Sequence, residues 1–171
     1  SPLTKVQDTW AARLLEDSDL CDAVAVLGPD AKRVPFVGVL LANVSEPMKK
    51  ALKGKFQEGV TQEVVLAHVT PEAFHCILRA AVHLDPGLSA QVVVPTLRAA
   101  KMYMIDGLAD ECLDYIRRRG QPEDALVVLS ACAALGEALP EDVERVLWCN
   151  ILLHPEQVLN SDAFASAHGS V

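Results

Sequence analysis

Residues 22–66 read DAVAVLGPDAKRVPFVGVLLANVSEPMKKALKGKFQEGVTQEVVL, and this stretch decides the fold. Two short segments rich in β-branched residues, 22–27 and 33–37, flank the turn residues of 28–32. This order is typical of a β-hairpin. Pro35 cannot donate a hydrogen bond to a neighbouring strand, so we expect it at an edge of the sheet or at a strand end.

The second half of the stretch predicts a helical run over 39–52 and a third β-like segment at 64–66. The tripeptide Phe56-Gln57-Glu58 lies between them. Helical and strand patterns thus follow one another closely. The sequence therefore predicts a mixed domain in which a small sheet is covered by helices.

The start of the chain predicts an amphipathic helix. Thr4-Lys5-Val6-Gln7 has the form of a capping box, in which the threonine and glutamine side chains bind backbone N–H groups of the first turn. Val6, Trp10 and Leu14 then follow the helical period, so one face should be buried. The periodicity leaves open whether this face packs on its own domain or on another subunit.

Helices dominate after residue 66. Thr70-Pro71 predicts a helix start, because a proline at the first helical position has no hydrogen bond to lose. The next helix should begin near Ser89 or, alternatively, at Val94. Pro95 causes this ambiguity, since inside a helix it removes a hydrogen bond and clashes with the preceding turn. A late start or a kink is therefore expected.

Gly120 marks the one clear boundary along the chain. Two further helices are predicted beyond it, and acidic residues in their first turns suit the positive end of a helix dipole. Their apolar positions are Leu126, Leu129, Cys132 and Leu135 in the first helix, and Val143, Leu147 and Ile151 in the second. The two should form an antiparallel pair, followed by a short helix within 155–164.

The composition excludes several classes of function. The 171 residues carry a formal net charge of −8, which argues against a nucleic-acid surface, because such a surface needs basic residues to displace counterions. Arg117-Arg118-Arg119 is expected in the last turn of a helix, where positive charge is favoured. No apolar run approaches the length of a bilayer span and no signal peptide is visible, so we expect a soluble protein.

Metal binding and catalysis are not expected either. The five cysteines, Cys21, Cys76, Cys112, Cys132 and Cys149, contain no C-x-x-C pair, which suits a reducing compartment. Neither they nor the five histidines show the spacing of a zinc site. The sequence also lacks a glycine-rich phosphate loop and a nucleophile signature. It therefore predicts neither an enzyme nor a bound cofactor.

Many short matches, taken in order, resemble the BTB/POZ domain. They are Asp22-Ala23-Val24-Ala25-Val26, Val34-Pro35, Leu41-Ala42 with Ser45, Val64-Val65-Leu66, Val69-Thr70-Pro71-Glu72-Ala73-Phe74, Leu97-Arg98-Ala99-Ala100-Lys101-Met102-Tyr103 and Leu108-Ala109-Asp110-Glu111-Cys112. Beyond Gly120 the chain resembles the start of a BACK region, a helical extension common in BTB adaptors. The resemblance implies an α+β BTB/POZ fold over 1–119 and an all-α BACK helix pair over 120–171.

Two departures fall at positions by which the family is usually recognised. Val37 stands where the family usually has histidine, and an apolar side chain can pack there without loss of the fold. Ala81 and Val82 precede His83 where the family often has tyrosines. The second departure removes polar and aromatic surface that helps to hold a partner.

The resemblance implies a protein-interaction module. Phe56-Gln57-Glu58 matches the hydrophobic-x-glutamate pattern of cullin-binding BTB domains, so the implied cullin-3 contact is Phe56 and Glu58, with Leu52 and Lys55 beside them. An aromatic ring offers area to bury in a partner, and a carboxylate fixes its orientation. The implied function is that of a substrate adaptor of a cullin-3 ubiquitin ligase, whose substrate binds a further domain outside this chain.

A homodimeric BTB scaffold, acting in assembly or transcriptional regulation without cullin, is the alternative. The missing histidine and tyrosines favour it, whereas the helical extension argues against a third possibility, the tetramerisation domain of a channel-like family. In either of the first two cases the resemblance implies a homodimer inside the cell, in the cytoplasm or nucleus. The implied dimer interface consists of Val6, Trp10, Leu14, Leu41 and Ser45.

Overall fold

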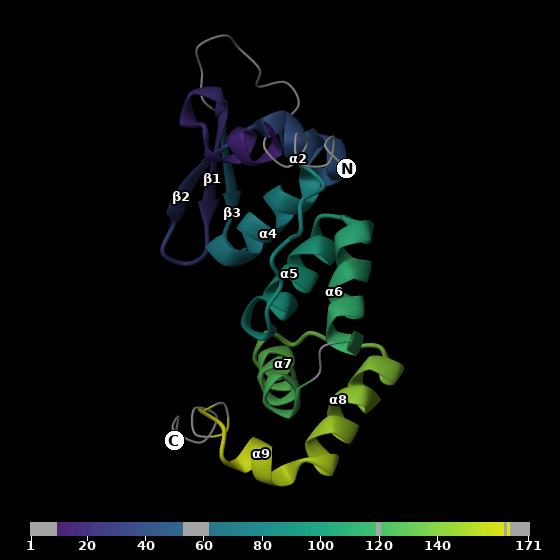
Figure 1. Cartoon of the computed structure of the whole chain (residues 1–171). Helices are drawn as coiled ribbons and strands as arrows, with labels where there is room; N and C mark the ends of the chain where they lie inside the picture. Colours follow the sequence, from purple (N-terminus) through teal and green to yellow (C-terminus); the bar gives the residue numbers. More distant parts are fainter. Residues whose placement is uncertain (1–9, 53–61, 119–120, 163, 165–171) are drawn as a thin grey trace. The chain divides into compact units, whose positions relative to one another are not determined.

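The computed structural model describes residues 10–52, 62–118, 121–162 and 164 (Figure 1). Residues 10–16 are helical. The elements that follow are a 3-10 helix η1 (Ser18–Leu20), β1 (Ala23–Leu27), β2 (Lys32–Phe36), α2 (Gly38–Val44), α3 (Glu46–Leu52), β3 (Gln62–Leu66), α4 (Pro71–Ala81), α5 (Ala90–Met102), α6 (Asp106–Arg118), α7 (Pro122–Leu135), α8 (Glu141–Leu153) and α9 (Pro155–Leu159). The predicted α+β class is confirmed.

The sheet has three strands in the order β2-β1-β3. β1 pairs with β2 antiparallel and with β3 parallel, so the predicted hairpin forms and β2, with Pro35, lies at an edge. Side chains of β1 alternate between the two faces, and Ala23, Ala25 and Leu27 are buried on one of them. Phe74 of α4 meets Phe36 of β2 edge to face, with ring centroids 5.4 Å apart. α4 therefore covers the buried face.

The run predicted as one helix over 39–52 is two helices, and Ser45 separates them. Its φ of −142° is extended, and its hydroxyl accepts the backbone N–H of Met48 at 3.2 Å, which makes Ser45 the N-cap of α3. The same hydroxyl donates to the carbonyl oxygen of Tyr103 at 2.6 Å. A long-range hydrogen bond thus ends the helix at a point that the apolar pattern does not mark.

α4 begins where the sequence predicts. Thr70 is its N-cap and accepts the N–H of Ala73 at 3.2 Å, with Pro71 at the first position. α5 begins at Ala90, just after Ser89, so the alternative start at Val94 is wrong. Pro95 lies inside α5, where a proline is about 3 kcal/mol less favourable for helix stability than an alanine.

The side chains around Pro95 offset that cost. Val93, Val94 and Leu97 are all fully buried. Each such burial stabilises the fold by about 1.5–3 kcal/mol, so together they exceed what the proline loses. Packing therefore keeps α5 helical through a residue that disfavours it.

The chain divides into two compact units, residues 1–87 with 99–106 and residues 88–98 with 107–171. The second unit includes both α6 and α8. Arg117 joins these helices, its guanidinium lying 3.1 Å from the Asp142 carboxylate and 3.2 Å from that of Asp114. Arg117 and Arg118 at the end of α6 thus bind carboxylates of the protein itself.

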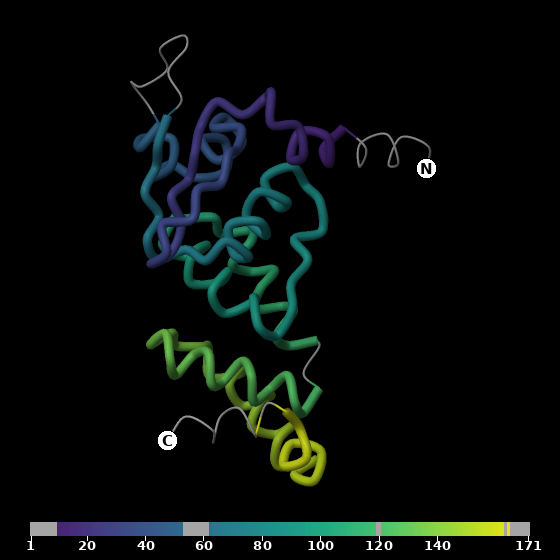
Figure 2. The backbone as a smooth tube through the Cα atoms, turned by 90° about the vertical axis from the view of Figure 1, so that its left-hand side faces the viewer, coloured from purple at the N-terminus to yellow at the C-terminus, as the bar shows by residue number. Residues whose placement is uncertain are grey.

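In the second unit α7 and α8 are packed neighbours, and α9 returns to contact α7 (Figure 2). Of the apolar positions that mark α7 in the sequence, only Cys132 is buried. The side chains that α7 buries are Pro122, Ala125, Val128 and Cys132, whereas Leu126, Leu129 and Leu135 are half-buried. α7 is apolar on most sides, so the sequence period does not select one face. On α8, the apolar positions Val143 and Leu147 are buried, and Ile151 is half-buried.

Gly136 ends α7 in the left-handed conformation, with φ 63°, and the N–H of Glu137 donates to the carbonyl oxygen of Cys132 at 2.9 Å.

Open space surrounds the position that a Cβ would take at Gly136 and at Gly107 in α6, but of these two glycines only Gly136 has a positive φ. We expect Gly136→Ala to lower the free energy of unfolding by about 1 kcal/mol. Gly107→Ala is the matched control and should raise it by about 0.5–1 kcal/mol. Urea denaturation measures both, and equal effects would contradict the cap.

Candidate partner-binding surfaces

Three of the four residues implied in cullin binding, Lys55, Phe56 and Glu58, lie outside the described residues. The fourth, Leu52, ends α3 with 1% of its surface exposed. Its side chain belongs to the core and holds the last turn of α3 in place. Leu52 therefore has almost no surface of its own to offer a partner, and it can act in partner binding only by positioning the residues that follow it.

The residues implied in dimerisation divide into exposed and buried groups. Trp10 is 51% exposed and Leu14 is half-buried on the helical segment 10–16, whereas Val6 lies outside the described residues. Leu41 and Ser45 are buried within the single chain. Trp10 is therefore the member of this set with the most surface to offer a second copy.

The two departures from the family pattern have local explanations. Val37 precedes α2 without a side-chain cap, and Asp22 takes over the task by accepting the N–H of Gly38 at 2.6 Å. Ala81 and Val82 are both 8% exposed. They fill the interior of the first unit, so the surface lacks the polar groups that tyrosines would supply there.

The described residues contain no group of three or more His, Cys, Asp or Glu side chains placed to hold a metal ion. Burial, together with the charges of Asp22 and Asp17, raises the pKa of the Cys21 thiol. A raised pKa disfavours the thiolate, which is the reactive form of cysteine. In the same parts of the chain, no helix is long and apolar enough to cross a membrane.

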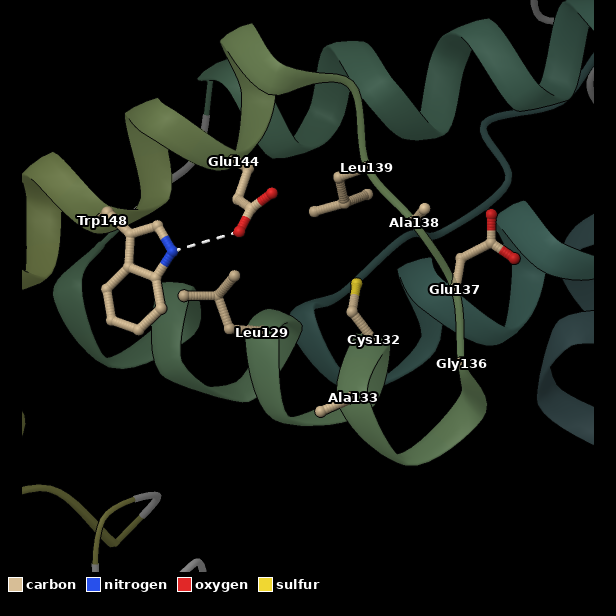
Figure 3. Close-up of a pocket in the computed structure, with 9 residues that line it drawn as sticks. All are labelled: Leu129, Cys132, Ala133, Gly136, Glu137, Ala138, Leu139, Glu144 and Trp148. Atoms are coloured by element: carbon tan, nitrogen blue, oxygen red, sulfur yellow. Dashed lines mark hydrogen bonds between the residues drawn. The ribbon is translucent and has the colours of Figure 1, made fainter.

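A groove opens between α7, α8 and the connection that joins them (Figure 3). Its volume is about 440 Å³, and we call it the α7–α8 groove. Its lining includes Leu129, Cys132, Glu137, Leu139, Glu144 and Trp148. Figure 3 shows the two helices side by side and running in opposite directions, which confirms the predicted antiparallel pair.

Trp148 gives the groove its most distinctive feature, and sequence reasoning did not single it out. The indole is 49% exposed, and its Nε1–H donates to Oε1 of Glu144 at 3.3 Å. A signal was available in the sequence. Trp148 lies off the apolar stripe of Val143 and Leu147, and it stands four residues after Glu144, at a spacing that lets helical side chains meet.

Comparison with known proteins identifies the family. Residues 12–119 match the family model of the BTB/POZ domain. BTB/POZ domain-containing protein 6 of mouse is 31% identical over 147 residues, which cover 86% of this chain and 26% of that protein. Human BTB/POZ domain-containing protein 3 is 27% identical over 155 residues, which cover 90% of this chain and 29% of that protein. The chain thus spans less than a third of these relatives.

Solved structures agree on the fold. The BTB domain of human Gigaxonin superposes with a TM-score of 0.52 at 18% identity, covering 65% of this chain and 87% of that domain. The BTB domain of zebrafish PATZ1 superposes with a TM-score of 0.50 at 16% identity, covering 67% of this chain and 91% of that domain. At such identities the likeness speaks for the fold alone.

Proposed function

Since this chain belongs to the BTB/POZ domain family, a family of protein-interaction modules, we propose that it is a substrate adaptor of a cullin-3 ubiquitin ligase. The observation that carries this proposal is the helical extension. The family match ends at residue 119, and the antiparallel pair α7 and α8 begins at Pro122. The BTB adaptors that the sequence resembles extend their cullin-binding surface with a helix pair at this place. We assign the BTB domain to 1–119 and a BACK-type extension to 120–171.

The proposed cullin site combines the segment that follows α3 with the start of α7. Phe56 supplies area to bury and Glu58 supplies a carboxylate that orients the partner. Lys55 precedes Phe56 in the sequence, and Leu52 holds the end of α3. The substrate is bound by a further domain of the whole protein, which acts in the cytoplasm or nucleus.

Calorimetry with the amino-terminal domain of cullin 3 tests this site. Phe56→Ala should weaken binding by about 2 kcal/mol or more, because a buried aromatic anchor carries a large share of the binding energy. Glu58→Ala should cost less if its carboxylate stays partly in water. Glu72→Ala, an exposed glutamate of α4, is the control for the loss of charge and should leave binding unchanged.

All three variants must keep the melting temperature of the wild type. A fall in melting temperature for Phe56→Ala would mean that the ring packs on its own domain. The proposed cullin site would be contradicted if the wild-type protein failed to bind cullin 3 at tens of micromolar. It would also be contradicted if Phe56→Ala were folded and bound cullin 3 normally.

The second candidate is a homodimeric scaffold without cullin, and two observations favour it. Ala81 and Val82 are buried where the family often presents tyrosines, and Trp10 is left exposed on the helical segment 10–16. The proposed interface is Val6, Trp10, Leu14, Leu41 and Ser45, of which Trp10 offers the largest described surface. A scaffold of this kind requires a dimer, so light scattering that shows a monomer at high micromolar concentration excludes it.

A further inference from the structure

We propose that the free edge of the sheet, strand β3, pairs with β3 of a second copy of this chain, so that two three-stranded sheets join into one. The residues involved are different from those considered above for the homodimer, and the inference does not depend on the cullin proposal. Three observations carry it: unpaired backbone groups along β3, a row of valines that ends at this edge, and an opposite edge that is blocked.

β3 presents unpaired backbone groups along one of its sides. It is parallel to β1, and the N–H of Gln62 donates to the carbonyl oxygen of Asp22 at 3.1 Å. Backbone groups alternate in direction along a strand, so those of Glu63 and Val65 point away from β1. In the sheet that the described residues form, β1 lies between β2 and β3, and β3 has no neighbour on its other side (Figure 1). Such an edge is a template for a further strand.

A row of apolar side chains on the outer face of the sheet runs to this edge. Val26 of β1 is aligned with Arg33 of β2 on one side and with Val65 of β3 on the other. Val26 is half-buried, and Val65 is 67% exposed. An antiparallel pair of β3 strands with Val65 opposite Val65 of the second copy continues the row, so that four valines lie side by side. Opposite side chains are about 4.5–5.5 Å apart, so the two Val65 side chains remove each other's surface from water.

The charge of Glu63 favours this register over its neighbours. Glu63 lies on the same face as Val65, and its carboxylate is 2.7 Å from the guanidinium of Arg33. A register with Glu63 opposite Glu63 of the second copy would place two like charges together, which is unfavourable. A register with Glu63 opposite Val65 would place a carboxylate against an apolar side chain. With Val65 opposite Val65, Glu63 instead faces the small, exposed Ala67 of the second copy.

The other edge of the sheet is protected from the same kind of pairing. β2 carries Pro35, which cannot donate a hydrogen bond, and Lys32, whose charge is exposed. Proline and lysine are common protections of an edge strand, and β3 contains neither. Since only one edge is open, pairing through β3 joins two sheets and does not continue into a longer array.

Cysteine cross-linking tests the register. Cys21→Ser and Cys149→Ser first remove a half-buried and an exposed thiol. In this background Val65→Cys should form a disulfide-linked dimer with oxidised glutathione, because opposite Cα atoms are about 4.5–5.5 Å apart, within the range of a disulfide. Glu63→Cys, on the same strand and face, is the matched control. Its Cα atoms would be about 13 Å apart, so it should link at least about tenfold more slowly.

Sedimentation velocity tests the backbone pairing without a cross-link. The paired strands are short, so the association should be weak and is followed up to about 1 mM protein. Val65→Pro removes the outward N–H but no hydrogen bond to β1, and it should raise the dissociation constant at least about tenfold. Val65→Thr keeps the N–H and the β-branched shape, and it should raise the constant less than about threefold. If the helical residues also form a dimer, the step that responds is from dimer to tetramer.

Circular dichroism verifies that each variant is folded. The proposal is overturned if Val65→Cys and Glu63→Cys link at the same rate, or if neither links. It is also overturned if folded Val65→Pro associates as strongly as Val65→Thr. Should Val65→Pro fail to fold, the pair of cysteine variants decides.

Discussion

Phe74→Ala should lower the free energy of unfolding by about 3–5 kcal/mol, a loss typical of removing a fully buried aromatic side chain. Phe74 is 1% exposed and packs edge to face on Phe36, so the substitution removes both the covering of the sheet and an aromatic pair. Relaxation of α4 cannot refill the space, because its neighbours Ala73 and Ile77 are buried as well. Urea denaturation followed by circular dichroism measures the loss.

His75→Ala is the matched control for Phe74→Ala. His75 is the next residue of the same helix and is exposed, so its loss should change the free energy of unfolding by less than about 0.5 kcal/mol. If the two substitutions destabilised the protein equally, α4 would not cover the sheet with the face that carries Phe74.

Leu147→Ala should lower the free energy of unfolding of the second unit by about 2–5 kcal/mol. Leu147 is 1% exposed on α8, the helix that packs against α7, so its truncation leaves a cavity between packed helices. Leu152→Ala, a change of the same chemistry on the same helix, is the control. Leu152 is 74% exposed, and its truncation should cost less than about 0.5 kcal/mol.

Trp148 reports this unit specifically when Trp10 is replaced by Phe, and its fluorescence separates unfolding of α8 from unfolding elsewhere. The two compact units need not unfold together, so a single transition is not assumed. A cost for Leu147→Ala no larger than that for Leu152→Ala would show that α8 does not pack through Leu147.

Local signals in the sequence predict the elements whose causes are themselves local. The turn residues between β1 and β2 produce the hairpin, Thr70 and Pro71 start α4, and Gly136 ends α7. In each case the side chain acts on its own backbone or on atoms a few residues away, so no knowledge of distant contacts is required. The order of many such matches also sufficed to indicate the BTB/POZ family.

The choice of faces depended on contacts that no local pattern contains. Ser45 divides the predicted helical run partly through a hydrogen bond to Tyr103, which lies 58 residues away. Leu41 and Leu52 are apolar, and each is buried in the single chain. The hydrophobic effect is non-directional, so an apolar pattern alone does not show whether a side chain is buried in its own core or against a partner.

What the sequence by itself determined is most of the elements, the α+β class and the acidic character of 120–171, because these follow from backbone preferences and from summed charge. What only the tertiary structure decided is which side of α7 is buried and where Trp148 lies. α7 is apolar on most sides, so the packing of α8 and α9 against it selects Ala125, Val128 and Cys132 for the interior and leaves Leu129 to line the groove. The physical reason is that burial depends on two surfaces that pack against each other. The sequence of one helix specifies only the surface of that helix.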